Sequence, residues 1–311
     1  MTTLIVHGTL AKGSTWYWSS WSENGFCRAV ADGMAQNHQA HDIWLANGRP
    51  VKSFEALNPK VRWTPWRGAS DILQTVEGRY EWTGSPEGLA RGAAAIWLVQ
   101  YLNALRKVTG EPIRIIAHSH GCNVVKLASS LPELDRAVFI ERAVFLACPH
   151  FWEEDYEFET PRTLEERLDI RKQMTPRRVG RKFRYRVSPD RFGRILNLYS
   201  RRDEVQLTLA ETWSGAYAPQ TGGFVENLLK SFRTLDVYER PHGTRTDEDP
   251  LARGLYEDRE VPVAADCSGI AAHSVLHGAT VGRAVGRWLS SSDTTASVGK
   301  IPEAPASDTG A

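Results

Sequence analysis

The sequence contains no long hydrophobic run, no excess of one charge and no internal repeat. Without an apolar stretch of about 18 residues it predicts no membrane-spanning helix. Without a basic segment followed by a short apolar one it predicts no secretion signal. Its 38 Lys and Arg residues nearly balance 37 Asp and Glu residues, giving a net charge of +1. That balance provides no general attraction to nucleic acid or acidic membranes. With no signal and no spanning helix expected, a cytoplasmic protein is the default expectation, and export by a route that needs no cleaved signal is the alternative.

Cysteine is also scarce, at four residues in 311, and no two of them form a C-x-x-C pair. Cys27, Cys122, Cys148 and Cys267 lie far apart along the chain. In a chain of this length, such scattered cysteines favour reduced core residues over a disulfide framework. Tryptophan, by contrast, is abundant at eleven residues. Indole rings suit an apolar substrate groove, although most are expected to pack in the core.

Short apolar runs alternate with longer segments of helical periodicity, a pattern typical of a parallel sheet whose strands are joined by crossover helices. The sequence predicts strands within residues 3–7, 112–117, 143–147 and 195–199. It predicts helices over residues 26–34, 89–105 and 281–289, and a further helix after Ser119. The expected fold class is therefore α/β, with a mostly parallel central sheet and helices on both faces.

Two stretches interrupt this alternation and are expected to be cap or lid insertions in a single domain spanning residues 1–290. Residues 151–190 are charge-segregated, because an acidic run precedes the basic cluster Arg171–Arg186. Residues 206–262 carry a weaker mixture of charges and polar turns. Both follow predicted strands, where α/β enzymes place the loops that shape their pockets. Residues 291–311 are mostly small and polar, which predicts a disordered tail.

The segment Ala117-His118-Ser119-His120-Gly121 fits the nucleophile elbow, a small-x-Ser-x-Gly pattern between a strand and a helix. The sharp turn strains the serine backbone and raises its hydroxyl above the sheet, while small flanking residues let the strand and the helix approach each other. The pattern alone is common, so its position between a strand and a helix is the stronger observation. The simpler alternative is that Ser119 only caps the helix.

Histidines near this serine could instead begin a binuclear metal motif, H-x-H-x-D-H. Cys122 and Asn123 stand where that motif requires Asp and His. Farther along, His273 and His277 have the i, i+4 spacing of a metal pair but lack the carboxylate of H-E-x-x-H. The sequence therefore predicts neither a metal site nor a cofactor.

A nucleophilic serine needs a histidine to remove its proton and an acid to orient that histidine. In an enzyme with such an elbow, the chain order is serine, acid, histidine. Asp203 follows a predicted strand and is the first candidate for the acid, with Glu204 and Asp266 as alternatives. His273 lies before the last helix and is the first candidate for the base, whereas His277 is expected to lie on that helix.

Attack by the serine would create an oxyanion, which needs fixed N–H donors worth about 3–4 kcal/mol each. The backbone amide of His120 is one expected donor. The second is expected at the turn that follows the first strand, from the amide of Thr9 or, as an alternative, Leu10. Gly8 lets the chain bend closely at this turn.

Together these segments resemble the α/β-hydrolase superfamily, in particular its lipase- and esterase-like members. The matching pieces are Ile5–Thr9, Ala117–Gly121, Tyr199–Asp203 and Ala272–Ser274. Between the first two, Glu81–Gly84 and Arg91 look like segments seen in some bacterial members of this group. The resemblance implies the α/β-hydrolase fold and hydrolysis of a carboxylic ester through an acyl-enzyme on Ser119, with His273 as base and Asp203 as orienting acid. The chain departs from the family pattern at Ala117, where the elbow usually has Gly.

The expected substrate is a small-molecule or lipid ester. Leu10, Trp16 and Trp18 are candidates for its pocket, with packing of their loop as the alternative. The cluster Arg171–Arg186 could give peripheral contact with anionic headgroups, but such a cluster is more often a solvated face. A thioesterase, an amidase, an acyltransferase or a phospholipase on the same scaffold is an alternative function. A catalytically silent binding module is the alternative from another class.

Overall fold

The computed structural model describes residues 2–8, 25–35, 84, 88–149, 154–157, 182–183, 185–203, 254–267, 269–292 and 297–304. Within these residues, the core is a parallel sheet of five strands in the order β1-β2-β3-β6-β7. The strands are β1 (Thr2–Val6), β2 (Ile113–His118), β3 (Ile140–Leu146), β6 (Phe192–Tyr199) and β7 (Tyr256–Glu260). Because all five run the same way, their carboxyl ends meet at one edge, where ligands bind in open α/β sheets.

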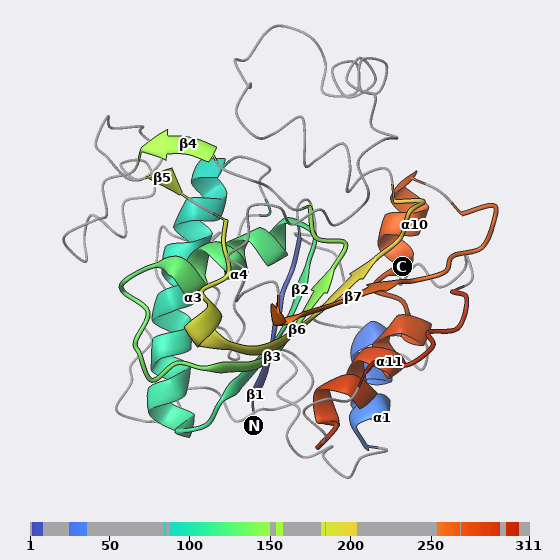
Figure 1. Cartoon of the computed structure of the whole chain (residues 1–311), viewed down its shortest axis with the longest axis horizontal. Helices are drawn as coiled ribbons and strands as arrows, with labels where there is room; N and C mark the ends of the chain where they lie inside the picture. The colour runs from blue at the N-terminus through green and yellow to red at the C-terminus, as the bar shows by residue number, and fades with distance from the viewer. Residues whose placement is uncertain are drawn as a thin grey trace, which may run out of the picture.

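Helices cover both faces of this sheet, as Figure 1 shows. On one face lie α3 (Gly88–Thr109) and α4 (His120–Ser130); on the other lie α1 (Phe26–Ala35), α10 (Gly269–Val275) and α11 (Ala279–Ser290). Alternation along β2 produces the two layers, because successive side chains of a strand point to opposite faces. Ile115 belongs to the core cluster that includes α3 and α4, whereas Ile116 belongs to the cluster that includes α1 and α11. The α/β class predicted from the sequence is confirmed.

Glycines allow α1 and α11 to pack backbone against backbone. A Cβ atom on Gly286 would lie 2.1 Å from the carbonyl oxygen of Val30, and one on Gly33 would lie 2.3 Å from that of Arg283. No side chain fits at such distances, so both positions require glycine. Helices α1 and α11, packed closely together, cover the face of the sheet on which α10 also lies.

The first expected insertion contains a small sheet of its own. There β4 (Glu154–Glu157) pairs antiparallel with β5 (Lys182–Phe183), and Figure 1 shows the pair beside α3, apart from the main sheet. The second expected insertion, 206–262, needs a correction, because β7 falls within it and forms an edge of the main sheet. Most residues of β7 are charged and three are exposed, so the strand lacks the apolar run by which buried strands are recognised. The other residues of both insertions lie largely outside the described ranges.

The structure also differs from the expected tail at residues 297–304, which pack on the domain. Ile301 and Ala304 are buried, and the amide of Ala304 donates to the carbonyl of Pro262 at 2.9 Å. At the start of this segment, the amide of Val298 and the hydroxyl of Ser297 donate to the carboxylate of Glu257 at 3.0 and 2.7 Å. The partly buried carboxylate of Glu257 thus helps to hold in place a segment whose composition favours disorder.

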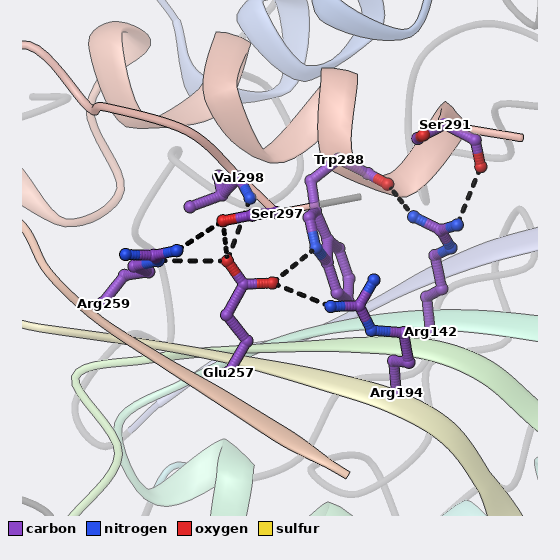
Figure 2. Close-up of polar contacts among 8 residues, drawn as sticks. All are labelled: Arg142, Arg194, Glu257, Arg259, Trp288, Ser291, Ser297 and Val298. Carbon is purple, nitrogen blue, oxygen red and sulfur yellow. Dashed lines mark hydrogen bonds and ion pairs between the residues drawn. The ribbon is translucent and has the colours of Figure 1, made fainter. Parts of the chain in front are cut away.

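Glu257 also receives hydrogen bonds from the body of the domain (Figure 2). Arg194 of β6 donates to it at 3.0 Å and the indole nitrogen of Trp288 of α11 at 3.3 Å. The guanidinium of Arg142 lies over the ring of Trp288 and donates to carbonyl oxygens at the end of α11. This polar cluster joins three sheet strands to α11 and to residues 297–298.

The structure bears on the expected lack of a membrane-spanning helix and on the expected state of the cysteines. Among the residues that the structure describes, none of the helices is both long enough and apolar enough to cross a membrane. Cys122, Cys148 and Cys267 are buried and none of the three forms a disulfide, as predicted. The side chain of Cys27 lies outside the described part.

Candidate active site

Ser119 lies in the sharp turn between β2 and α4, at the carboxyl edge of the sheet. Its backbone has φ 51° and ψ −130°, which is a strained conformation for a residue other than glycine. Such a conformation costs about 1–3 kcal/mol. The serine amide donates to the carbonyl of Leu146 in β3 at 2.8 Å, which fixes the turn to the neighbouring strand. The serine side chain makes no capping hydrogen bond to α4, so the simpler alternative of a helix cap receives no support.

Two glycines let other chain segments approach this turn. A Cβ on Gly121 would lie 2.4 Å from the carbonyl oxygen of His7, so α4 can begin directly against the end of β1 only with glycine there. A Cβ on Gly8 would lie 2.7 Å from the Cβ of Ser119. Gly8, the second residue after β1, therefore lies beside the serine, and the sequence predicts an oxyanion donor at the residue that follows it. Ala117, which stands where the elbow usually has Gly, is fully buried in β2. The positions that leave no room for a Cβ are Gly8 and Gly121.

Asp203 and His273 are joined by a hydrogen bond of 2.8 Å between Oδ2 and Nδ1. Asp203 is fully buried in the turn after β6, and His273 lies on α10, 9% exposed. The two segments are bonded to each other, since the amide of Gly269 donates to the carbonyl of Arg202 at 3.0 Å. A buried carboxylate at Nδ1 favours the tautomer with hydrogen on Nδ1, which leaves the lone pair on Nε2.

The imidazole of His273 lies beside the residue that precedes the serine. Its ring centroid is 4.7 Å from that of His118. The sequence predicts His277 on the last helix, but His277 lies in the turn between α10 and α11. Its ring lies 4.9 Å from His118, edge to face. Of the two candidate bases, His273 is the one bonded to Asp203.

The remaining histidines of this region are held neutral. Burial, followed by the charges of His273 and His277, lowers the pKa of His118 well below its usual value. Burial, followed by the charges of Arg91 and His273, does the same to the pKa of His120. Burial and the charge of His273 lower the pKa of His277 to about 3. These rings can therefore pack against a protonated His273 without adding a second positive charge.

Arg91, which the sequence singles out only by its resemblance to bacterial members of that group, also lies in this region. It is fully buried on α3, and its Nε donates to the hydroxyl of Tyr185 at 3.2 Å. Its guanidinium carbon lies 5.6 Å from the centre of the tyrosine ring. Arg91 precedes Ala94 and Leu98 at i+3 and i+7, on the apolar face of a predicted helix. An arginine on such a face is the signal that could have revealed it.

Several predicted residues lie outside the described part of the chain. These are the oxyanion donor Thr9, the alternative donor Leu10, the pocket candidates Trp16 and Trp18, and the alternative acid Glu204. Most of the cluster Arg171–Arg186 also lies outside it. Asp266, the other alternative acid, is exposed in the loop before α10, whereas Asp203 is buried against the histidine. His120, the other expected donor, begins α4 directly after the serine.

The part of the chain that the structure describes contains no group of three or more His, Cys, Asp or Glu residues arranged to hold a metal ion. No protein-family model matches the chain, and no curated protein matches its sequence. The described residues thus define an α/β protein whose parallel sheet carries a strained serine and a buried Asp–His pair at its carboxyl edge.

Proposed function

We propose that this protein is a serine hydrolase of the α/β-hydrolase type that cleaves carboxylic esters through an acyl-enzyme on Ser119. The observation that carries the proposal is the 2.8 Å hydrogen bond from His273 to the buried Asp203, at the sheet edge where Ser119 turns with positive φ. An exposed surface pair of this kind would contribute little. A fully buried carboxylate that holds one edge of an imidazole instead serves to orient it and to stabilise its protonated form.

The reaction would proceed in two halves. Nε2 of His273 accepts the hydroxyl proton as Oγ of Ser119 attacks the carbonyl carbon, and the carbonyl electrons form an oxyanion. Amide N–H groups of His120 and of the turn after β1 would bind this oxyanion. When the intermediate collapses, the C–O bond to the alcohol breaks and His273 protonates the leaving oxygen. Water, deprotonated by His273, then attacks the acyl-enzyme, and the acid leaves as Ser119 regains its proton.

Covalent labelling tests the proposal directly. A fluorophosphonate probe should attach to the wild-type protein, with the adduct mapped to Ser119 by peptide mass spectrometry. Ser119→Ala should abolish labelling. Ser129→Ala is the matched control, because Ser129 is a buried serine of α4, the helix that follows Ser119, and its loss should leave labelling unchanged. A folded wild-type protein that resists the probe would be a silent binding module instead.

The substrate class needs a second experiment, since the proposed machinery accepts different leaving groups. Hydrolysis of nitrophenyl esters of increasing acyl length, with matched thioesters, anilides and phospholipids, separates the possible activities. We expect the highest kcat/KM for carboxylic esters. A preference for any of the other three classes by tenfold or more would replace the esterase assignment.

A further inference from the structure

Three histidine rings meet at the carboxyl edge of the sheet. The ring of His118, the last residue of β2, lies close to both of the others: its centroid is 4.7 Å from that of His273 and 4.9 Å from that of His277. The planes of His118 and His273 are tilted by 57°, and those of His118 and His277 by 87°. His118 is 5% exposed, so its ring is enclosed.

Gly8 also lies against the ring of His118. A Cβ on Gly8 would lie 2.9 Å from Nδ1 of His118. The ring is therefore confined by Gly8 and by the two downstream histidines. Alternation along β2 explains its direction, because His118 shares a face with Ile116, which packs in the core that includes α1, α11 and part of α10.

A single hydrogen bond cannot fix the orientation of an imidazole. The bond from Nδ1 to Asp203 holds one edge of His273, but small coupled rotations about χ1 and χ2 can still displace Nε2 while that bond is kept. Contact against the face of the ring restricts those rotations and keeps Nε2 aimed in one direction. The ring of His118 provides such a contact, and its backbone continues directly into Ser119. One residue thus joins the base to the nucleophile.

His118 also suits the protonated form of His273. Burial and neighbouring charges keep the pKa of His118 well below its usual value, so this ring stays uncharged while its neighbour gains a proton. An aromatic ring within about 6 Å of a cation attracts it through the negative face of its π system. A lysine or an arginine at this position would repel the imidazolium instead.

We propose that His118 is a positioning residue of this enzyme, whose ring packs against His273 and holds that base toward Ser119. The inference rests on the proposed function, because it assigns a role in the same reaction. It adds a fourth residue to the nucleophile, the acid and the base. It also gives the two histidines of the elbow different roles, because His120 contributes its backbone amide and His118 its side chain.

Kinetics of three variants test the inference. His118→Ala removes the ring contact and should lower kcat for the best ester about 10- to 100-fold, the loss that accompanies a small misplacement of a reacting group. KM should change by less than about twofold, since a positioning residue acts on the base and not on the binding of substrate. His118→Phe keeps a planar ring and should recover most of the lost kcat. Ile116→Ala is the matched control: it removes a buried side chain from the same face of β2 and should lower the unfolding temperature with kcat unchanged.

The outcomes separate this inference from the proposed function. If the wild-type protein resists the fluorophosphonate, the proposed function fails. If the wild type is labelled but His118→Ala retains its kcat, only the role of His118 is overturned. An equal loss in His118→Phe and His118→Ala would also overturn it, because ring packing would then not be the cause. Should His118→Ala not fold, His118→Leu replaces it, since leucine fills a similar volume without a planar ring.

Discussion

Nδ1 of His273 lies 2.8 Å from Oδ2 of Asp203, although 70 positions separate the two residues in the chain. The contact exists because the carboxyl end of β6, which Asp203 follows, and helix α10, which carries His273, lie at the same edge of the sheet. Asp203 is fully buried there, and its carboxylate has an imidazole N–H as a partner. This buried pair is what the proposed chemistry most depends on.

Asp203→Asn tests that dependence with almost no change in shape. The amide cannot accept a hydrogen bond through its NH₂ group, and it removes the negative charge that stabilises a protonated His273. We expect kcat for ester hydrolysis to fall by about 10³- to 10⁴-fold, as for orienting acids in serine enzymes generally. Steady-state kinetics on the folded variant measure the loss. Asp266→Asn changes an exposed acid before the same helix and should retain full activity, so equal losses in both variants would contradict the assignment.

Gly121→Ala tests the close approach of α4 to β1. The new methyl group would lie 2.4 Å from the carbonyl oxygen of His7 and 2.6 Å from that of Val6. Backbone atoms cannot yield cheaply, so the free energy of unfolding should fall by about 1–3 kcal/mol, measured by urea titration. At Gly254 a Cβ would meet nothing within 4 Å, and Gly254→Ala should stay within about 0.5 kcal/mol of wild type. A stable Gly121→Ala variant would contradict the tight packing.

His277 should remain uncharged in the folded protein across the neutral and mildly acidic range. Burial and the charge of His273 lower the pKa of His277 to about 3. In the unfolded chain it titrates near 6.5, so below that pH unfolding takes up a proton at this site. The free energy of unfolding must then decrease as the pH falls, by up to about 1.4 kcal/mol per pH unit from this residue.

Imidazole ¹⁵N chemical shifts measure the state of His277. They should show the neutral form from pH 5 to pH 8. His277→Gln should weaken the decline of stability between pH 6.5 and pH 5, which urea titrations at several pH values detect. A titration of His277 with a midpoint near pH 6.5 in the folded protein would contradict its enclosure.

Glu257 should stabilise the fold only while it is ionised. Burial alone would raise its pKa, but hydrogen bonds from Ser297, Val298, Arg259 and Trp288 outweigh that effect, so the pKa lies below the ordinary value of 4.5. With a lowered pKa in the folded state, its contribution is complete above pH 5 and declines as the pH falls through the folded pKa.

Glu257→Gln measures this contribution. We expect the variant to lose about 2 kcal/mol of unfolding free energy at pH 7, the scale of hydrogen bonds to a charged group, and to approach wild type in more acidic solution. Glu260→Gln is the matched control on the same strand. Its side chain is 40% exposed and pairs with an exposed Arg201, so it should change stability by less than about 1 kcal/mol. A deficit in Glu257→Gln that stays constant with pH would refute the electrostatic explanation.

Most of the sheet could be predicted because its signal is local. Buried parallel strands are apolar runs of a few residues, and β1, β2, β3 and β6 all appear as such. The elbow could be predicted as well, because the strain at Ser119 and the close approach at Gly121 restrict which residues fit. The edge strand β7 is not predicted, because a polar strand with one neighbour carries no apolar run. The sequence predicts His277 on a helix for the opposite reason, since its spacing fits a helical period that the chain interrupts.

The sequence by itself determined the alternation of strands and helices and the residue types that could serve as nucleophile, acid and base, since local sterics and burial patterns select these. Only the tertiary structure decided which acid meets which histidine, that residues 297–304 pack on Glu257, and that the ring of His118 lies against His273. Those contacts join residues far apart in the chain, and their distances depend on how strands and helices pack. No periodicity along a single chain encodes that packing.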